Sequence, residues 1–372
     1  MFCSCSGSPS SLCLRLEPSR RMETHAIGSG IECPMTPRPL SIVVPTYNRA
    51  SLIGRALTSV QPDLLPGDQV VVVDDASTDH TPDIVKAFPF AEYVRIPHGG
   101  AGRARNAGVS HARHHMVAFL DSDDEFIPGT LGCKRALMDA RRDLVFCFSN
   151  FSGQPEHGPR VPARVVDWSG DPRPWDEILA PGQPLSTLVA DPCAVDPRVH
   201  IGSMYRQEMT AGYIAINTVI VSRELAGDAM RFPEDLPTYE DWECFGRLSG
   251  RGPCAFLAFD SAIQHGHSQP RLTDAAMEVR VSARLALLGR VWGSDASFLA
   301  TYADDYSRTC DGQRLLGAKI LILQGRLPEA RAYLAAVRGG PIWARAARQV
   351  PIPSVALKTF RALKHWRQQQ HQ

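Results

Sequence analysis

Short apolar runs alternate with amphipathic stretches through residues 39–150, at the spacing of a sheet covered by helices. The apolar runs are typical of buried parallel strands. The predicted strands are 41–44, 70–73, 93–96, 116–120 and 144–148. The predicted helices are 51–60, 81–88, 102–114 and 128–140. Strands and helices that alternate in this way predict an α/β fold with a mostly parallel sheet between helices.

The pattern changes after residue 150. Residues 152–203 contain many Pro and Gly and show little periodicity, which predicts a long irregular segment of the kind that is often functional. An apolar run at 213–221 predicts another strand, and residues 239–248 predict a helix with one buried face. The composition from residue 274 onward is helical. The predicted helices there are a hairpin of 315–323 and 328–337, and a final helix that begins at Ser354.

Composition is typical of a globular protein. The chain has 372 residues, of which 44% are hydrophobic and 21% are charged. It contains no apolar stretch of the roughly 18 residues that a membrane-spanning helix needs, so we expect a cytoplasmic protein. Residues 1–38 lack the apolar core of a signal peptide, which predicts a disordered leader or a start assigned too early, with Met22 or Met35 as the true first residue.

The ten cysteines include no pairs at zinc-ligand spacing. Without a secretory signal, this predicts free cytosolic thiols.

Charge is distributed unevenly. Residues 330–372 hold eight Lys and Arg and no Asp or Glu, so the remainder of the chain carries a net charge of −7. A basic tail suggests an anionic partner, and the final helix is predicted either to contact the inner face of a membrane peripherally or to pack as an ordinary surface helix. Nucleic acid is disfavoured, because little aromatic interleaving accompanies the basic residues beyond Phe360 and Trp366.

Polar segments follow four of the predicted strands. They are Pro45-Thr46-Tyr47-Asn48, 74–79, 98–108 and Asp121-Ser122-Asp123-Asp124. The carboxyl ends of parallel strands share one edge of the sheet, where open α/β sheets bind ligands. Carboxylates gathered there suit a hard divalent cation that is shared with a substrate diphosphate.

Each segment also has a plain alternative. The first could be a helix-capping turn, the second an Asx-turn and the acidic group a solvated turn. The Gly-rich segment lacks the Gly-Lys-Ser/Thr of a Walker-type loop, and its arginines could be surface charges. A fifth segment, 239–243, contains Glu240 and Asp241. The plain alternative for these two acids is that they simply compensate the dipole at the start of a helix.

Together, the five segments resemble the inverting glycosyltransferases of family 2, which have a nucleotide-sugar-binding fold of the GT-A type. The resemblance rests on 41–49, 71–79, 102–108, 119–124 and 239–243, and it covers roughly residues 40–250. It implies a GT-A domain at 39–272, with a nucleotide-binding half at 39–150 and an acceptor half at 151–272. Residues 273–372 would form a helical C-terminal extension.

The resemblance also implies roles for individual residues. The donor nucleotide would be bound by Pro45, Thr46, Tyr47, Asn48, Asp75, Arg105, Asn106, Asp121 and Ser122. A Mn²⁺ or Mg²⁺ cofactor would be held by Asp121, Asp123 and, more weakly indicated, His267. Asp241 would be the general base, with Glu240 beside it, and the neighbouring Trp242 could raise the pKa of Asp241 by desolvation.

The implied function is transfer of a sugar, with inversion, from a nucleotide-diphosphate sugar to a hydroxyl group of a polysaccharide or lipid-linked glycan. A UDP-sugar is the expected donor, with dTDP and GDP as alternatives. A sugar-nucleotide pyrophosphorylase is disfavoured, because such enzymes open with a Gly-rich basic phosphate loop. The remaining alternative is a catalytically silent member of the same fold that binds a glycan or a partner.

Overall fold

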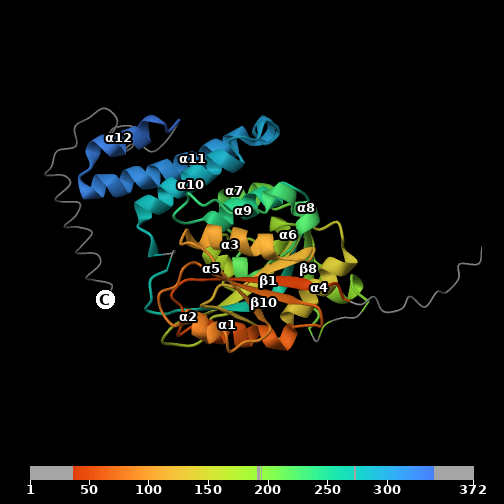
Figure 1. Cartoon of the computed structure of the whole chain (residues 1–372). Helices are drawn as coiled ribbons and strands as arrows, with labels where there is room; N and C mark the ends of the chain where they lie inside the picture. The colour runs from red at the N-terminus through yellow and green to blue at the C-terminus, as the bar shows by residue number, and fades with distance from the viewer. Residues whose placement is uncertain (1–36, 191–192, 194, 272–273, 339–372) are drawn as a thin grey trace, which may run out of the picture. The chain divides into compact units, whose positions relative to one another are not determined.

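The computed structural model describes residues 37–190, 193, 195–271 and 274–338. These residues form a ten-stranded sheet in the order β3-β2-β1-β4-β9-β6-β10-β8-β7, with β5 paired to β10 (Figure 1). The strands are β1 (Leu40–Thr46), β2 (Gln69–Asp74), β3 (Ala91–Arg95), β4 (Met116–Phe119), β5 (Glu125–Phe126), β6 (Phe146–Gln154), β7 (Gln183–Pro184), β8 (Arg198–Gly202), β9 (Ile220–Ser222) and β10 (Cys254–His265). The mixed, mostly parallel α/β fold that the sequence predicts is confirmed.

Helices cover both faces of this sheet. The α-helices are α1 (Ile53–Val60), α2 (Thr81–Val85), α3 (Gly100–His111), α4 (Thr130–Ala140), α5 (Val165–Ser169), α6 (Trp175–Ile178), α7 (Tyr205–Thr210), α8 (Arg223–Ala226), α9 (Glu240–Ser249), α10 (Met277–Val291), α11 (Ala296–Gln324) and α12 (Leu327–Ala335). Figure 1 shows α1 and α2 on one face and α3 and α9 on the other.

The alternation of side chains along β1 explains this arrangement. Ile42 and Val44 belong to the core beneath α1 and α4, whereas Val43 belongs to the core beneath α9. Successive side chains of a strand point to opposite faces, so a continuous apolar run is buried on both sides.

Two predictions for the middle of the chain are wrong in part. The run 213–221 is not one strand: it holds a 3-10 turn at Ile216–Thr218, and β9 begins only at Ile220. The segment 152–203 contains the end of β6, helices α5 and α6, and strands β7 and β8. Strand β10 was not predicted, because its pairing with β6 shifts register on both sides of Asp260 and breaks the two-residue period.

The predicted hairpin near the C-terminus is confirmed as α11 and α12. Gly325 ends α11 in the left-handed conformation with φ of 83°, which a residue without Cβ adopts at no steric cost. The final helix from Ser354, the basic tail beyond residue 338 and the leader 1–36 lie outside the described residues. Within the described chain, no helix is both long enough and apolar enough to span a bilayer.

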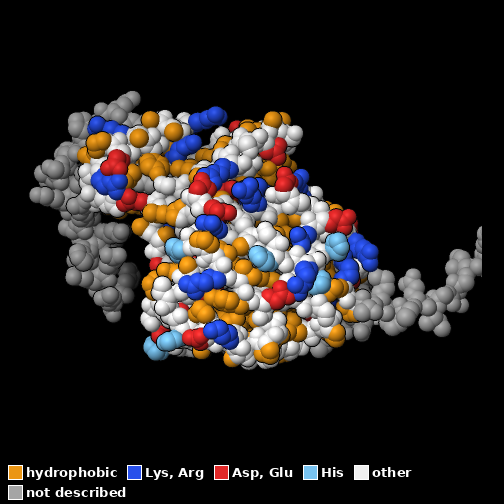
Figure 2. All heavy atoms as spheres, viewed as in Figure 1, with side chains coloured by type: hydrophobic (Ala, Val, Ile, Leu, Met, Phe, Trp, Pro, Cys, Tyr) orange, Lys and Arg blue, Asp and Glu red, His pale blue; other side chains and the backbone are white. Residues whose placement is uncertain are grey.

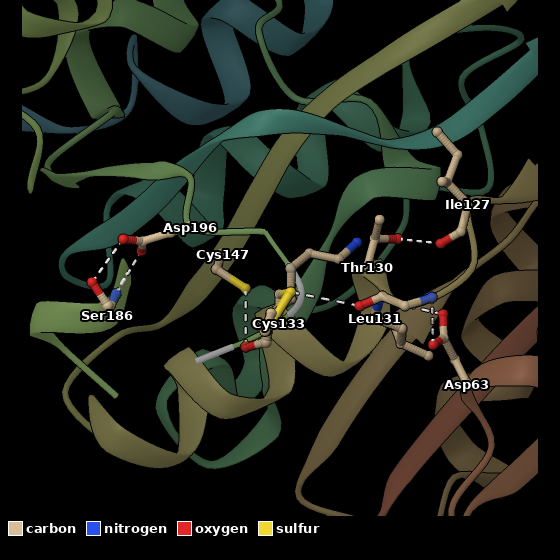
Figure 3. The surroundings of a disulfide bond; sticks show 11 residues. Asp63, Ile127, Thr130, Leu131, Cys133, Cys147, Ser186 and Asp196 are labelled. Atoms are coloured by element: carbon tan, nitrogen blue, oxygen red, sulfur yellow. Dashed lines mark hydrogen bonds between the residues drawn. A yellow bond between two sulfur atoms is a disulfide. The ribbon is translucent and has the colours of Figure 1, made fainter. Parts of the chain in front are cut away.

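A disulfide joins Cys133 on α4 to Cys193, so the prediction of free thiols is wrong for these two residues (Figure 3). Their Cα atoms are 5.5 Å apart although they are separated by 60 positions in sequence. Cys193 lies between β7 and β8 in the chain, and no local spacing in the sequence reveals its pairing with α4. Four other described cysteines are free and buried: Cys147, Cys244, Cys254 and Cys310.

Charged side chains of both signs are interspersed on the face of the molecule shown in Figure 2.

Candidate functional site

The predicted polar segments meet at one edge of the sheet. Strand β1 pairs in parallel with both β2 and β4, so the loops after all three strands emerge together. Strands β4 and β6 both run antiparallel to β9, and β10 is parallel to β6. The carboxyl end of β10, which leads to His267, therefore arrives at the same edge.

Three carboxylates gather after β4. One oxygen from each of Asp121, Asp123 and Asp124 lies within 4.8 Å of the others. Asp124 is buried, and its oxygens accept hydrogen bonds from Asn217 Nδ2 at 2.8 Å and from the backbone N–H of His265 at 3.1 Å. Burial and the two neighbouring acids raise the pKa of Asp124 well above its usual range. Asp124 thus anchors the loop, while Asp121 and Asp123 remain partly exposed.

His267 borders this acidic group. Its Nε2 lies 2.8 Å from Asp123 Oδ2, and its Nδ1 is buried without a hydrogen-bond partner among the described residues. Two guanidinium groups, those of Arg49 and Arg271, each approach Asp123 to 3.9 Å. The partly exposed carboxylate oxygens of Asp121 and Asp123 make a donor set that fits Mn²⁺ or Mg²⁺, and His267 borders it through Asp123.

Arg105 on α3 bridges two acids that are far apart in sequence. Its NH2 donates to Asp121 Oδ1 at 2.8 Å, and its NH1 donates to Glu240 Oε1 at 2.6 Å. The guanidinium is buried and also lies 5.6 Å from the ring centroid of Phe232. The acids Asp121 and Glu240 hold the pKa of Arg105 above its ordinary value despite burial. Arg105 therefore joins the acidic group to the start of α9.

Asp241 follows Glu240, the first residue of α9. Its Oδ1 accepts the backbone N–H of Trp242 at 2.7 Å. Burial, and next the charge of Glu240, raise the pKa of Asp241 to about 7, while Arg105 opposes the shift. A carboxylate with a pKa near neutrality is suited to accept a proton from a hydroxyl group. Tyr239, just before the pair, has a φ of 67°, in a region that non-glycine residues rarely adopt.

Tyr47 and His98 form an aromatic pair at the same edge. Their ring centroids are 4.6 Å apart, and Tyr47 is 42% exposed. His98 Nδ1 lies 2.9 Å from Asp75 Oδ2. Asp75 also accepts the backbone N–H groups of Gly99 at 2.7 Å and Gly100 at 2.8 Å, at the start of α3. His98 lies within the Gly-rich segment 98–108, but no local pattern indicates a role for it, because its partners come from other loops.

The remaining predicted donor residues are placed unequally. Pro45, Thr46 and Ser122 are buried, and the Thr46 hydroxyl has no hydrogen-bond partner within the described chain. Asn48 has φ of 50° and joins two loops, since its Oδ1 accepts the backbone N–H of Thr78 at 2.8 Å. Asn106 exchanges two hydrogen bonds of 2.8 Å with the backbone of Phe232. Asn106 thus connects α3 to the loop that contains Phe232, and its predicted contact with the donor stays a prediction.

Two glycines of the segment 102–108 permit close packing. A Cβ on Gly102 would lie 2.4 Å from the carbonyl oxygen of Pro233, and one on Gly108 would lie 2.2 Å from Val43 Cγ1. Both distances are shorter than van der Waals contact. The glycines thus bring α3 against β1 and against the loop that precedes α9, which places Arg105 between Asp121 and Glu240.

Comparison with known proteins gives consistent matches. Residues 41–207 match the family described as "Glycosyl transferase family 2". The succinoglycan biosynthesis protein ExoO of Rhizobium meliloti is 29% identical over 304 residues, which cover 80% of this chain and 76% of ExoO. The poly(ribitol-phosphate) beta-N-acetylglucosaminyltransferase TarS of Staphylococcus aureus is 36% identical over 106 residues, which cover 27% of this chain and 18% of TarS.

Solved structures show the same fold. S. aureus TarS 1–349 in complex with UDP-GlcNAc superposes with a TM-score of 0.55 and 18% identity, covering 89% of this chain and 92% of that one. The mannosyltransferase PcManGT from Pyrobaculum calidifontis, in complex with GDP-Man and Mn²⁺, superposes with a TM-score of 0.50 and 19% identity, covering 89% and 81%. At these identities the likeness concerns the fold alone.

Proposed function

Because the chain belongs to glycosyltransferase family 2, we propose that it transfers a sugar with inversion from a nucleotide-diphosphate sugar to a hydroxyl group of a polysaccharide or lipid-linked glycan. The family and the GT-A fold expected from the sequence are confirmed. The pyrophosphorylase alternative is not retained, because it does not fit this family. The observation that carries the proposal is the buried Arg105 bridge between Asp121 and Glu240, which holds an acidic group next to a carboxylate with a pKa of about 7.

The metal would be held by Asp121 and Asp123, with His267 as a further ligand. When bound, a divalent cation stabilises the negative charge of the leaving diphosphate as a Lewis acid. The carboxylate ligands suit both Mn²⁺ and Mg²⁺, and of the two we favour manganese. The PcManGT structure contains Mn²⁺, which supports this preference.

The protein groups divide the remaining work. Asp241 accepts the proton of the acceptor hydroxyl, a contribution typically worth about 10²–10⁴-fold in rate. Arg105 fixes Asp121 and Glu240 in buried hydrogen bonds, so the two acidic regions keep their spacing. The pair Tyr47 and His98 offers an aromatic surface for the nucleotide base. With the general base Asp241 and the leaving diphosphate on opposite sides of the anomeric carbon, displacement inverts the configuration of that carbon.

A uridine donor is supported by the TarS complex with UDP-GlcNAc. The PcManGT complex contains GDP-Man instead, so the nucleotide needs a direct test. The printed function of ExoO, succinoglycan biosynthesis, supports a polysaccharide acceptor.

Calorimetric titration of UDP, dTDP and GDP, each with and without Mn²⁺, tests the donor site. We expect one nucleotide to bind in a Mn²⁺-dependent manner to the wild type, and this binding to be lost in Asp123→Asn. The control is Asp143→Asn, which alters an exposed acid paired with Arg141 and should bind as the wild type does. Failure of a folded wild-type protein to bind any of the three would overturn the donor assignment and favour the catalytically silent alternative.

Replacement of the base is a separate test. Asp241→Asn should bind the same nucleotide within twofold of the wild-type Kd and should lose transfer by at least about 10²-fold. Full turnover in this variant would show that Asp241 is not the base, while leaving the donor site intact.

A further inference from the structure

Helix α10 contacts the residue that precedes the acidic pair Glu240–Asp241. Arg280 Nε donates a hydrogen bond of 2.9 Å to Tyr239 Oη. The guanidinium carbon of Arg280 also lies 5.8 Å from the centroid of the Tyr239 ring. Tyr239 is the residue with φ of 67°, a conformation that costs free energy and persists only where surrounding contacts hold it.

The same helix contacts the residue that follows the pair. Arg284 lies over Trp242, with its guanidinium carbon 3.4 Å from the centroid of the ring. Arg284 is 3% exposed, and its NH2 donates to the backbone carbonyl of Met209 on α7. Trp242 Nε1 in turn donates to the carbonyl of Glu208 at 2.9 Å. Trp242 is thus held between α7 and α10.

The two arginines are four positions apart and therefore lie on one face of α10. The rings of Tyr239 and Trp242 meet edge to face, with centroids 5.3 Å apart, and Asp241 lies between these residues in the chain. Trp292, just after α10, lies against Gly246 near the middle of α9. A Cβ added to Gly246 would come within 2.9 Å of the Trp292 ring. Contacts from α10 and the turn after it therefore reach α9 on its first turn and near its middle.

We propose that Arg280 and Arg284 of α10 are positioning residues, which hold the first turn of α9 so that Asp241 faces the acceptor hydroxyl. This inference rests on the proposed function, because it concerns the proton transfer assigned to Asp241. The arginines act through Tyr239 and Trp242 and do not touch the reacting atoms. The C-terminal helices accordingly contribute to turnover through α10, in addition to packing against the catalytic domain.

The test combines Arg280→Met with Tyr239→Phe. Met keeps an apolar stem and removes the donor, while Phe keeps the ring and removes the Oη acceptor. The readouts are the steady-state release of UDP from UDP-GlcNAc with Mn²⁺ and water as the acceptor, and the Kd of UDP by calorimetry. If the calorimetric titration of UDP, dTDP and GDP identifies a nucleotide other than UDP, a sugar donor that carries that nucleotide replaces UDP-GlcNAc. Arg314→Met is the control, because Arg314 pairs with Asp311 within α11.

Each single variant should lower kcat about 10- to 100-fold and leave the Kd of UDP within twofold, since a small displacement of a catalytic group costs rate rather than donor affinity. The double variant should be no slower than the slower single variant, because both changes break one contact. Arg284→Met should show the same kcat loss, and if it fails to fold, the pair Arg280 and Tyr239 still decides the question.

The inference is overturned if kcat of both single variants stays within twofold of the control, or if their effects multiply in the double variant. A Kd that rises in step with the fall in kcat would also overturn it, because that indicates general disruption of the site. Asp241→Asn separates the two proposals. If Asp241→Asn is inactive and the α10 variants are fully active, only the positioning role fails; if Asp241→Asn is active, the proposed base fails.

Discussion

The rate of transfer should depend on the ionisation of Asp241, with a midpoint near pH 7. Burial is the largest cause that raises its pKa from 3.8 to about 7, followed by the charge of Glu240. A general base is active when it is deprotonated, so kcat/KM for the donor, which reports the pKa values of the free enzyme, should increase with pH and reach a plateau above the pKa. With a pKa of about 7, roughly nine-tenths of the enzyme is active at pH 8 and roughly one-tenth at pH 6, an approximately tenfold difference.

Glu240→Gln perturbs this profile in a defined direction. It removes the neighbouring negative charge, so the ionised form of Asp241 becomes easier to reach and the midpoint should move to lower pH. The ratio of kcat/KM at pH 8 to kcat/KM at pH 6 should then fall below the wild-type value. The assay is nucleotide release at donor concentrations well below KM and at constant ionic strength, with the Kd of the nucleotide measured at each pH. A wild-type kcat/KM that does not change between pH 6 and pH 8, or an unchanged midpoint in Glu240→Gln, would refute the assignment of Asp241 as the base.

Three further predictions concern packing, a buried acid and the disulfide. Gly102→Ala places a Cβ 2.4 Å from the carbonyl oxygen of Pro233, so it should displace the loop before α9 and lower kcat more than tenfold. Gly132→Ala is the control and should have full activity, because its added Cβ meets no described atom within 4 Å apart from its chain neighbours and the backbone of its own helix. Burial raises the pKa of Glu208 from 4.5 to about 8, so the folded state binds more protons than the unfolded state between these values, and the free energy of unfolding should fall as pH rises from 5 to 8. Glu208→Gln should make this pH dependence shallower in urea unfolding without abolishing it, because Asp124 and Asp241, whose pKa values are also raised, still contribute; an equal slope in the variant would contradict the assignment. Cys133→Ser should lower the free energy of unfolding by up to about 4 kcal/mol, as expected for a crosslink between residues 60 positions apart, and a reductant should shift the unfolding midpoint of the wild type but not of the variant.

The sequence was sufficient to predict features that depend on local pattern. Strands β1, β2 and β4 are continuous apolar runs, and their carboxyl ends must coincide once they pair in parallel. This geometry is why four loops could be assigned to one edge before any contact was known. The helix at 239–248 was recognisable in the same way, from one apolar stripe.

Features that depend on pairing between distant segments could not be predicted. Arg105 and Glu240 are separated by 135 positions, and only the fold of the completed sheet brings them to 2.6 Å. His98 contributes through Tyr47 and Asp75, which belong to other loops. The contacts of α10 were likewise hidden, because residues after 273 lie beyond the part of the chain that carries the family motifs.

Burial decides between the alternatives that the sequence left open for the acids. A solvated acidic turn would leave its carboxylates in water, yet Asp124 is 2% exposed and burial raises its pKa. An acid that only compensates a helix dipole can stay in water, yet Glu240 is 6% exposed and accepts a hydrogen bond from the buried guanidinium of Arg105. Such an accumulation of like charge destabilises a fold unless cations balance it. Arg105 balances part of it, and the partly exposed oxygens of Asp121 and Asp123 are where a divalent cation would supply the rest. The arrangement of these acids is therefore more typical of a binding site, in which a bound cation balances the negative charge, than of an ordinary protein surface.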